Sequence, residues 1–577
     1  MSSAQADLAN ATEVTRIDDK AQAKVASKIE DYDAMLHDAA QVTQEEQSVG
    51  IWETIRRHPY AIMWVMLFGL GLVQEGYDLM LLSSFYAQPA FTRRFGTCNA
   101  AGVCEISAPW QSGLNNGALV GEILGLQVVG VVSERFGYRK TMMVSSALMV
   151  AFIFIPFFAT SLPVLLVGQI LQGMPWGVFQ TLTTTYAADI APLQLRGVLT
   201  SYNNICWVMG QLLASGILRA CLNAPGRWAY KIPYALQWVW PPIIIVACLF
   251  APESPWWLVR QKRLAEAETS LRKLASTHAE FTHEAATAKI NEMILTTELE
   301  RETRAGARYF DCFKGTNLRR TEIGVMVYLA QVFGGAPLMG YSTYFFLQAG
   351  FSVNNSFNMT IGLFALGFVG TVLSWFAMSK FNRRLMFLFG LAVAVVILMV
   401  TGAVGAAAGD TPSGQWAIGA MLLLFTFFYD FTVGPVAYSL VAEVPSAQLR
   451  AKSVALSRNS YNLGGLIANA ITPRMLNPDA WNWGAKSGFF WAGTACLWFL
   501  WCFFRLPDPT GRTYLELDAL FEAKVPARKF RTTRLELFGA QQDKPVHASS
   551  SLEKISSAGH EKEEGNQTQT HTATYNA

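Results

Sequence analysis

Charged residues are scarce in this sequence. Asp, Glu, Lys and Arg make up 15% of its 577 residues, whereas hydrophobic residues make up 52%. Soluble globular domains have about 25% charged residues. The net charge is only +3, and no dense run of Lys and Arg offers a footprint for nucleic acid. This composition excludes an ordinary soluble globule and a nucleic-acid-binding protein, and it favours a chain that crosses a membrane several times.

Motifs for catalysis are also missing. The sequence contains no cluster of metal-ligating residues at typical spacings, no nucleophile elbow and no phosphate-binding GxxxxGK[ST] loop. We therefore expect neither an enzyme nor a nucleotide-driven pump, and no cofactor or metal. The first fifty residues are polar and lack an apolar core, so we expect no signal peptide and an N-terminus that stays in the cytoplasm.

Cysteine is rare outside the apolar segments. Most of the eight cysteines lie within such segments, where a small buried hydrophobic residue is the usual role. Cys98 and Cys104 lie instead in a short polar stretch. If that stretch faces an oxidising exterior, the sequence is compatible with a small disulfide loop and equally with two free thiols.

Long apolar segments recur along the chain. A helix of about twenty apolar residues crosses the hydrocarbon core of a bilayer, and this length predicts twelve such helices. Their expected positions are 60–85, 111–132, 141–159, 162–187, 200–222, 234–250, 321–348, 355–378, 385–408, 416–441, 453–475 and 486–504. The predicted fold class is an all-α polytopic membrane protein, with two pseudo-symmetric six-helix bundles and a cytoplasmic amphipathic helical insert between them.

Basic residues beside the predicted helices set the expected orientation. The loops after helices 2, 4, 8 and 10 carry them, as do the insert and both tails, whereas the loops after helices 3, 7 and 9 carry essentially none. Both termini are therefore expected in the cytoplasm. The expected regions are an N-terminal tail (1–55), a first bundle (56–250), a linker (251–320), a second bundle (321–505) and a C-terminal tail (506–577) that is disordered from about residue 541.

Four of the charged residues inside predicted helices are candidates for a role in transport: Glu75 and Asp78 in the first, Glu122 in the second and Arg458 in the eleventh, with Asp430 in the tenth as a weaker candidate. A charge at the bilayer centre costs roughly 3 kcal/mol even on the lenient insertion scale, so such residues mark transport pathways. Glu75 and Asp78 are three residues apart and project from the same side of a helix. Two close carboxylates in a poorly hydrated site do not both ionise cheaply, which favours binding of a proton.

We therefore predict that these four residues couple transport to protons, with Arg458 paired to one of the three acids. The alternative is that the acids form hydrogen bonds with the backbone or lie in a wet vestibule.

The two predicted bundles share loop motifs at equivalent places. SERFGYRK (Ser133–Lys140) after helix 2 is matched by SKFNRRL (Ser379–Leu385) after helix 8. TYAADIAPLQLRG (Thr185–Gly197) after helix 4 is matched by SLVAEVPSAQLRA (Ser439–Ala451) after helix 10, and each places an acid seven residues before an arginine. Ordinary solvated loop charges explain any one motif but not matched pairs. Duplicated six-helix halves are typical of the major facilitator architecture, whose substrate site lies near the membrane midplane.

Further motifs carry a resemblance to one family. They are PESPWW (Pro252–Trp257) after helix 6, DPTGRTYLELDALF (Asp508–Phe521) after helix 12, and GYD (Gly76–Asp78) in helix 1. With the paired loops, they make residues 60–525 resemble the sugar porters of the major facilitator superfamily. Longer strings, such as QEGYD (Gln74–Asp78) and YDFTVGPVAYSLVAEVP (Tyr429–Pro445), are similar to fungal α-glucoside permeases, the maltose-permease type of proton symporter.

The resemblance implies a multi-pass transporter of the plasma membrane that imports maltose or a related di- or trisaccharide with a proton, by alternating access. A proton-independent facilitator and a transporter-like sugar sensor are alternatives that share the same sugar site. The implied partners are the sugar, the proton and the lipid bilayer, and the protein is expected to work as a monomer. Lys544, Lys554 and Lys562 are candidate sites for ubiquitin-type regulation, or they simply make the tail soluble.

The resemblance also assigns residues to gating and to the conserved loop positions of the family. They are Arg135, Gly137, Arg139, Asp189, Arg196, Glu253, Arg383, Arg384, Glu443 and Arg450.

A site for a neutral sugar needs amides and hydroxyls that both donate and accept hydrogen bonds, and aromatic faces for the apolar sides of the rings. Asn204 and Gln211 are seven residues apart in helix 5 and so share one face. The resemblance places both at sugar-contacting positions. It adds these candidates from the second bundle: Gln331, Tyr341, Tyr438, Tyr461 and Asn462. The alternative for each is a hydrogen bond that merely joins neighbouring helices.

The sequence departs from the family pattern in two places. Helix 7 carries Ala330, Ala336 and Gly340 where sugar porters often have larger polar residues, which predicts a wider cavity that suits a glycoside larger than glucose. Helix 4 carries Gln169 where many proton-coupled members have an arginine that pairs with the GYD aspartate. We therefore expect Arg458 to supply the relocated counter-charge.

Overall fold

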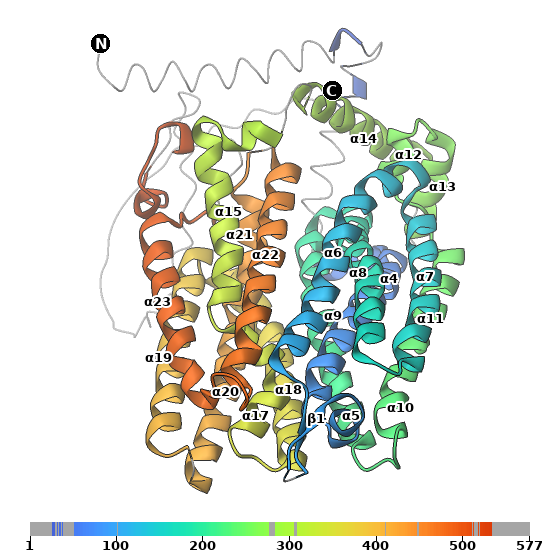
Figure 1. Ribbon diagram of the computed structural model, residues 1–577. Coiled ribbons are helices and arrows are strands. Elements are labelled where there is room, and N and C mark those ends of the chain that lie inside the picture. The colour runs from blue at the N-terminus through green and yellow to red at the C-terminus, as the bar shows by residue number, and fades with distance from the viewer. Residues whose placement is uncertain are drawn as a thin grey trace, which may run out of the picture. The chain divides into compact units, whose positions relative to one another are not determined.

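Long helices run side by side in two groups in the computed structural model (Figure 1). The first group consists of α4 (Pro59–Phe85), α6 (Ala108–Phe136), α7 (Tyr138–Phe158), α8 (Leu162–Ile190), α9 (Leu193–Cys221), α10 (Trp228–Leu236) and α11 (Trp240–Phe250). The second group consists of α15 (Gly315–Phe333), α16 (Ala336–Gly340), α17 (Ser342–Gln348), α18 (Val353–Lys380), α19 (Arg383–Ala407), α20 (Pro412–Phe431), α21 (Val433–Glu443), α22 (Arg450–Leu476) and α23 (Ser487–Arg505). The predicted twelve-helix arrangement is confirmed, with α10–α11, α15–α17 and α20–α21 each filling the place of one predicted helix.

The structure describes most of the chain between residues 51 and 510. The described residues are 26–28, 32, 34–35, 37, 51–100, 102–275, 283–304, 309–409, 411–446, 449–510, 512, 517 and 520–533. The described helices belong to one compact unit, Met1–Thr533. The candidate ubiquitin sites and the predicted disorder of the tail from about residue 541 lie outside the described residues.

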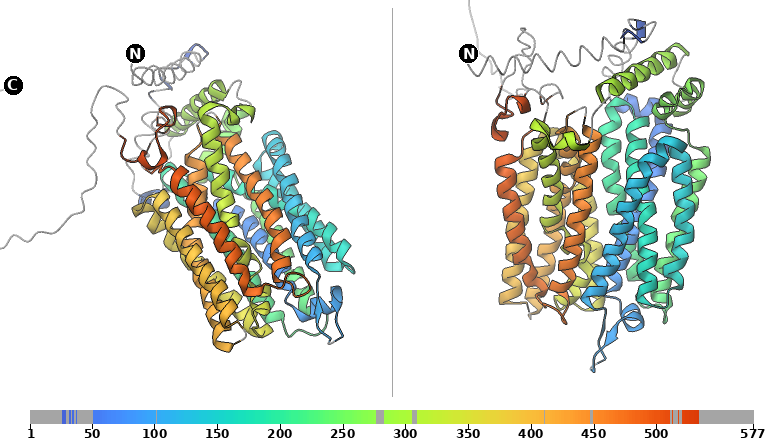
Figure 2. Two further views of the ribbon diagram at one scale, coloured as in Figure 1. Left: turned by 60° about the vertical axis from the view of Figure 1, so that its left-hand side comes forward. Right: turned by 45° about the horizontal axis from the view of Figure 1, so that its top comes forward.

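The two ends of the bundle differ (Figures 1 and 2). One end carries the short helices α12 (Pro255–Arg260), α13 (Leu264–Leu274) and α14 (His283–Arg304), and we call it the linker end. The opposite end carries α5 (Pro89–Phe95) and a two-stranded hairpin of β1 (Thr97–Cys98) and β2 (Cys104–Glu105), and we call it the hairpin end. The predicted helical insert is confirmed as helix.

Nine helices of the described part of the chain are long and apolar enough to cross a membrane. The three predicted spans outside this set are α9, α15–α17 and α22, which pack in the same bundle: α9 lies along α4, and α22 lies along both α6 and α15. These helices carry Asn204, Gln331 and Arg458, and such polar residues lower the mean hydropathy of a helix. The helices that lack a simple membrane signal are therefore among those that carry the predicted site.

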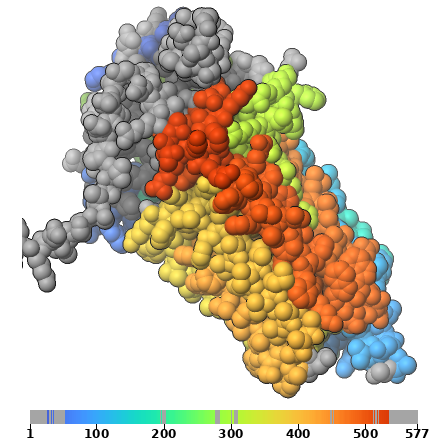
Figure 3. Space-filling model, turned by 90° about the vertical axis from the view of Figure 1, so that its left-hand side faces the viewer, coloured from blue at the N-terminus to red at the C-terminus, as the bar shows by residue number. Residues whose placement is uncertain are grey.

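Apolar side chains cover the outside of the bundle. Figure 3 shows the face over α19 and α23. Large apolar side chains exposed on these two helices include Phe389, Val396, Leu497 and Phe504. Exposed apolar surface of this extent is unfavourable in water but suits contact with lipid tails.

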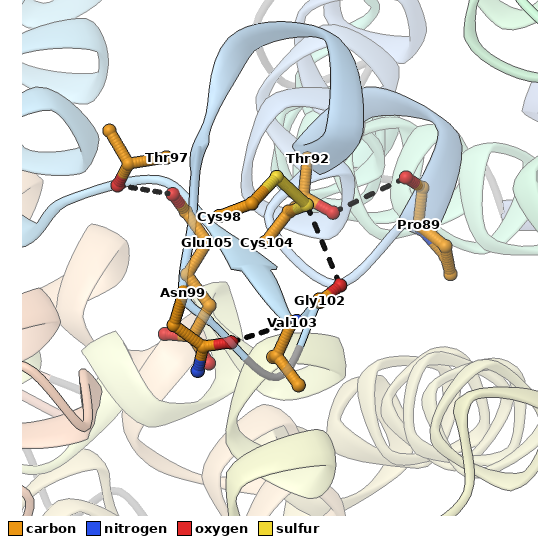
Figure 4. Close-up of a disulfide and its surroundings, with 9 residues drawn as sticks. All are labelled: Pro89, Thr92, Thr97, Cys98, Asn99, Gly102, Val103, Cys104 and Glu105. Carbon is orange, nitrogen blue, oxygen red and sulfur yellow. Dashed lines mark hydrogen bonds between the residues drawn. A yellow bond between two sulfur atoms is a disulfide. The ribbon is translucent and has the colours of Figure 1, made fainter.

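A disulfide closes the hairpin (Figure 4). Cys98 and Cys104 are opposite each other in the two strands and are bonded, which is one of the two outcomes that the sequence left open. The side-chain oxygen of Asn99 accepts a hydrogen bond from the backbone N–H of Val103 (3.0 Å) and holds the turn. Glu105 follows directly and reaches the second group, as described below.

Helices α6 and α8 approach closely through glycines. A Cβ atom added to Gly121 would lie 2.0 Å from the carbonyl oxygen of Ile170, and one added to Gly125 would lie 2.1 Å from that of Met174. Small residues spaced by four allow helix backbones in a membrane to come this close. Glu122 lies between the two glycines, so this contact fixes where its side chain leaves α6.

We predict that Gly121→Ala destabilises the fold. The added methyl group must push α8 away, and overpacking of this kind costs about 1–3 kcal/mol. Fluorescence-detected size-exclusion chromatography after heating should show a lower melting temperature and less monodisperse protein. Gly130→Ala is the matched control on the same helix, because a Cβ there meets no atom of the described residues within 4 Å. Equal losses in both variants would contradict the prediction.

Candidate functional site

A cavity lies between the two groups of helices. Its wall comes from α4, α6 and α9 of the first group and from α15, α16, α18 and α20–α22 of the second. The residues with polar or charged side-chain groups that line it are Glu75, Ser83, Asn115, Glu122, Asn204, Trp207, Gln211, Gln331, Tyr341, Tyr429, Asp430, Tyr438, Arg458, Tyr461 and Asn469. Three of the four charges predicted to couple protons are therefore in the wall of one cavity.

Glu75 on α4 binds two helices of its own group. Its Oε1 atom accepts hydrogen bonds from Gln180 Nε2 on α8 (3.0 Å) and from Trp207 Nε1 on α9 (3.2 Å). Its Oε2 atom is buried and has no hydrogen-bond partner among the described residues. The carboxylate thus has one oxygen that accepts two bonds and one that remains available.

Glu122 on α6 joins the first group to the second. Its Oε1 atom accepts a hydrogen bond from Asn462 Nδ2 (3.2 Å) and lies 3.8 Å from Arg458 Nη2. The Nε atom of Arg458 donates to Gln180 Oε1 (3.0 Å). Because Gln180 also binds Glu75, one polar chain runs from Glu75 through Gln180 and Arg458 to Glu122. We call these four residues the polar relay.

Aromatic rings complete the surroundings of Arg458. Its Cζ atom lies 4.5 Å from the centre of the Tyr461 ring and 5.9 Å from that of Tyr328. The rings of Tyr328 and Tyr438 meet edge to face, with their centres 5.9 Å apart. A guanidinium over aromatic faces is stabilised electrostatically, and more strongly where water is excluded.

Asp78 is directed away from the relay. Its Oδ2 atom accepts a hydrogen bond from Trp176 Nε1 on α8 (3.2 Å), and Asp78 is not among the cavity-lining residues. Gln169, which stands where the family often has an arginine, donates to Gln172 at 3.5 Å. Of the three predicted acids, Glu122 thus contacts Arg458 directly and Glu75 reaches it through Gln180.

Six of the seven residues predicted to contact sugar line the cavity: Asn204, Gln211, Gln331, Tyr341, Tyr438 and Tyr461. The seventh, Asn462, binds Glu122 instead. The Nδ2 atom of Asn204 is buried without a hydrogen-bond partner among the residues that the structure describes. An unpaired buried amide of this kind is costly unless a ligand or water completes its bonding.

Two of these residues, Gln331 and Tyr341, also form hydrogen bonds that join neighbouring segments of the protein. The side-chain amide of Gln331 donates to the carbonyl oxygen of Gly434 (2.9 Å), beside the break between α20 and α21. The hydroxyl of Tyr341 accepts a hydrogen bond from Asn115 on α6. Of the small residues in the seventh predicted helix, Ala336 and Gly340 line the cavity, whereas Ala330 is buried elsewhere.

Hydrogen bonds join the two groups on the hairpin side of the cavity. Ser84 and Thr343 share one between their hydroxyls (3.0 Å), and Asn116 donates to the carbonyl oxygen of Leu466 (3.2 Å). Beside the disulfide, the carboxylate of Glu105 accepts a hydrogen bond from the Tyr344 hydroxyl (3.4 Å). These contacts cross the boundary between the groups at that end.

The loop motifs meet at the linker end of the first group. The Glu253 carboxylate accepts hydrogen bonds from the backbone N–H groups of Tyr138 (2.9 Å) and Arg139 (3.3 Å). Burial raises the pKa of this carboxyl, and the backbone donors oppose that shift. Gly137 has a φ of 90°, and a Cβ there would lie 2.6 Å from Glu253 Oε2. Asp189 joins the cluster by accepting a hydrogen bond from the hydroxyl of Ser254 (2.6 Å).

The second group has a matching cluster. Arg383 donates to Glu443 Oε1 (3.2 Å), and Arg384 donates to the carbonyl oxygen of Phe503 (2.7 Å). Arg450 is the first residue of α22. In the first group, Arg135 lies over the neighbouring Phe136 ring, with 5.5 Å between Cζ and the ring centre. The side chain of Arg196 lies outside the described part of the chain.

Sequence reasoning missed Gln180 and Trp207. Trp207 is three residues after Asn204, a spacing that places both on one helical face and would have been a signal. Gln180 offered only its polarity within an apolar helix. Asp430 also lines the cavity, and a Cβ on Gly367 would lie 2.4 Å from its Oδ2 atom, so the glycine leaves room for this carboxylate.

Comparisons with known proteins show that this chain is similar to sugar transporters. A family model described as "Sugar (and other) transporter" matches residues 63–521. The general alpha-glucoside permease of Saccharomyces cerevisiae (strain ATCC 204508 / S288c) is 42% identical over 523 residues, which cover 90% of this chain and 84% of that protein. Maltose permease MAL31 of the same strain is 40% identical over 512 residues, covering 88% and 83%.

Solved structures show the same fold. The partially occluded, inward-open xylose transporter XylE from E. coli has a TM-score of 0.64 at 20% identity, and the match covers 79% of this chain and 100% of that chain. The XylE structure bound to 6-bromo-6-deoxy-D-glucose, described as a major facilitator superfamily symporter, has a TM-score of 0.64 at 22% identity, covering 80% and 99%. The match to the family model and the identity of about 40% to the two permeases show that the present chain belongs to the sugar transporter family, and the solved structures show that its fold is that of a major facilitator transporter.

Proposed function

We propose that this protein imports an α-glucoside, such as maltose or a related di- or trisaccharide, together with a proton. The substrate class follows the names of the permeases that are about 40% identical to it. The observation that carries proton coupling is the polar relay, in which carboxylates of the first group hold an arginine of the second at the cavity wall. A sugar has no charge, so these charges serve another ligand.

The relay suggests how a proton changes the conformation. Ionised Glu75 and Glu122 hold Arg458 across the two groups, and protonation of either removes part of that attraction. A weaker bond between the groups allows one to rock against the other, which is how transporters of this architecture alternate access. A charge moving through 100 mV yields about 2.3 kcal/mol and one pH unit yields about 1.4 kcal/mol, which together support sugar accumulation of several hundredfold.

The cavity wall supplies the sugar site in this proposal. Asn204 and Gln211 on α9 offer amides from the first group, and Tyr438 and Tyr461 offer aromatic faces from the second. Amides bind hydroxyls, and ring faces cover the apolar sides of the sugar. The small side chains of the seventh predicted helix leave room for a second sugar unit.

We propose that the hairpin end faces the exterior and the linker end faces the cytoplasm of a plasma-membrane protein. The Cys98–Cys104 disulfide supports this because such bonds persist in oxidising compartments. Basic loop residues such as Arg139, Arg383 and Arg384 lie at the linker end, and an excess of such residues is typical of cytoplasmic loops. The hydrogen bonds on the hairpin side then describe a state that is closed to the outside. Both termini are cytoplasmic in this proposal, and the protein acts as a monomer.

The deciding experiment is uptake of labelled maltose by cells that lack their own permeases, with the external pH recorded. Symport predicts that sugar addition makes an unbuffered medium more alkaline and that collapse of the proton gradient abolishes accumulation. Uptake that persists without proton entry would establish the alternative, a facilitator.

We predict that Glu122→Gln abolishes accumulation but keeps downhill sugar exchange. The amide has the same shape but no charge, so it cannot hold Arg458 as the ionised carboxylate does, and internal sugar should only equilibrate with the medium. Uptake time courses with and without a proton gradient provide the measurement. Glu134→Gln makes the same change on the same helix at a residue whose side chain is 57% exposed, and it should accumulate sugar normally. Undiminished accumulation by Glu122→Gln would remove Glu122 from the coupling of sugar to protons.

We predict that Asn204→Leu weakens sugar binding. Loss of one neutral hydrogen bond of about 1 kcal/mol corresponds to an increase in KM of about fivefold. The proton-to-sugar ratio should stay unchanged at saturating sugar. Ser215→Ala is the control on α9, because this buried hydroxyl donates only to the carbonyl oxygen of Gln211 in its own helix (2.8 Å). An unchanged KM in Asn204→Leu would show that the amide serves helix packing instead.

A further inference from the structure

We propose that Gln180 is a positioning residue that transmits protonation of Glu75 to Arg458, and so to the contact between the two helix groups. This inference rests on the proton coupling proposed above. In this inference, an uncharged residue of α8 links the protonation of Glu75 in the first group to the position of Arg458 in the second group.

The chemistry of the two neighbours determines the orientation of the Gln180 amide. An ionised carboxylate only accepts hydrogen bonds, and a guanidinium only donates them. The amide provides one donor group and one acceptor, and both contacts are 3.0 Å long: Nε2 to Glu75 Oε1, and Oε1 from Arg458 Nε. A charged or apolar side chain at this position satisfies one neighbour at most.

The bonding of Glu75 indicates where a proton binds. Its Oε1 atom already accepts bonds from Gln180 and Trp207, whereas Oε2 is buried and has no partner in the described part of the chain. The proton therefore attaches to Oε2. Oε1 then remains an acceptor, but its hydrogen bonds are no longer charge-assisted. A charge-assisted hydrogen bond is about twice as strong as a neutral one, so the bonds to Oε1 become weaker. Protonation thus loosens the Gln180 side chain without direct contact between the proton and Arg458.

Arg458 has an alternative partner when this hold weakens. Its Nη2 atom lies 3.8 Å from Glu122 Oε1, longer than its 3.0 Å bond to Gln180. The charged and titratable groups that face Glu75 are Glu122 on α6 together with Arg458 and Tyr461 on α22. Once Glu75 is neutral, Glu122 is the remaining carboxylate of the relay. Arg458 then moves from Gln180 toward Glu122, which provides the two arrangements that a switch requires.

The test uses two substitutions of Gln180 in the full-length protein, with surface amount measured in parallel. Gln180→Leu has a similar size and no polar atoms. It should keep downhill maltose exchange but lose at least tenfold in accumulation, and its sugar-induced proton uptake should fall. Gln180→Glu keeps an acceptor for Arg458 but repels Glu75 while it is ionised. A protonated glutamate again offers one donor and one acceptor, so this variant should regain accumulation at acidic external pH, where Gln180→Leu does not.

Asn203→Leu is the matched control. Asn203 on α9 donates to the hydroxyl of Thr184 on α8 (3.1 Å), and that hydroxyl donates to the backbone carbonyl oxygen of Gln180 (2.9 Å). This variant therefore removes a polar contact between α8 and α9 near Gln180 without removing any bond of the Gln180 side chain. It should couple normally. Full coupling in Gln180→Leu, or an equal loss in Asn203→Leu, would overturn the role of Gln180. Maltose entry without proton entry in the wild-type protein would instead overturn the proposed function, so the two failures are distinguishable.

Discussion

The arrangement of the two helix groups depends on compensation of one buried cation. The Arg458 side chain is 14% exposed, and removing a guanidinium from water is costly unless it is paired and hydrogen-bonded. Its partners come from α6 and α8 of the first group, Glu122 and Gln180, and from aromatic rings of its own group. Any movement of one group against the other must therefore break or exchange these contacts. The charge state of the residues around Arg458 thus affects how easily the two groups move.

Backbone packing makes this compensation possible. The close glycine contacts between α6 and α8 bring the backbones together around Glu122, and a Cβ on Gly177 would lie 2.4 Å from the Glu122 carbonyl oxygen. Gln180 is three residues beyond Gly177 on α8 and so shares its face of the helix. Both partners of Arg458 are thus presented from one rigid pair of helices. The close packing of α6 and α8 matters because two loosely packed helices would move together with Arg458, and its contacts with Glu122 and Gln180 would then not change.

Apolar runs long enough to cross a bilayer account for nine of the predicted helices, and α9, α15–α17 and α22 were predicted although their polar residues weaken that signal. The same reasoning placed Glu75 and Asp78 on one side of α4, and both contact α8, at Gln180 and Trp176, which are four residues apart. What the sequence could not predict is how α4 is rotated against its neighbours. Because of that rotation, Glu75 lies in the cavity wall and Asp78 lies in the interior of the first group. Gln180 escaped prediction for a related reason: a lone amide in an apolar helix has no pattern until its two charged neighbours are known.

In the mechanism proposed above, charge balance within the polar relay favours a single proton per transport cycle. With Glu75 and Glu122 ionised and Arg458 positively charged, the relay has a net charge of −1. One bound proton makes it neutral, and a second would leave Arg458 without an ionised partner in the relay. Closure of the cavity removes water from these groups, and desolvation penalises any uncompensated charge. The singly protonated relay is therefore the form in which closure of the cavity has the lowest desolvation cost. In this way, binding of a proton is linked to the conformational change although the sugar carries no charge.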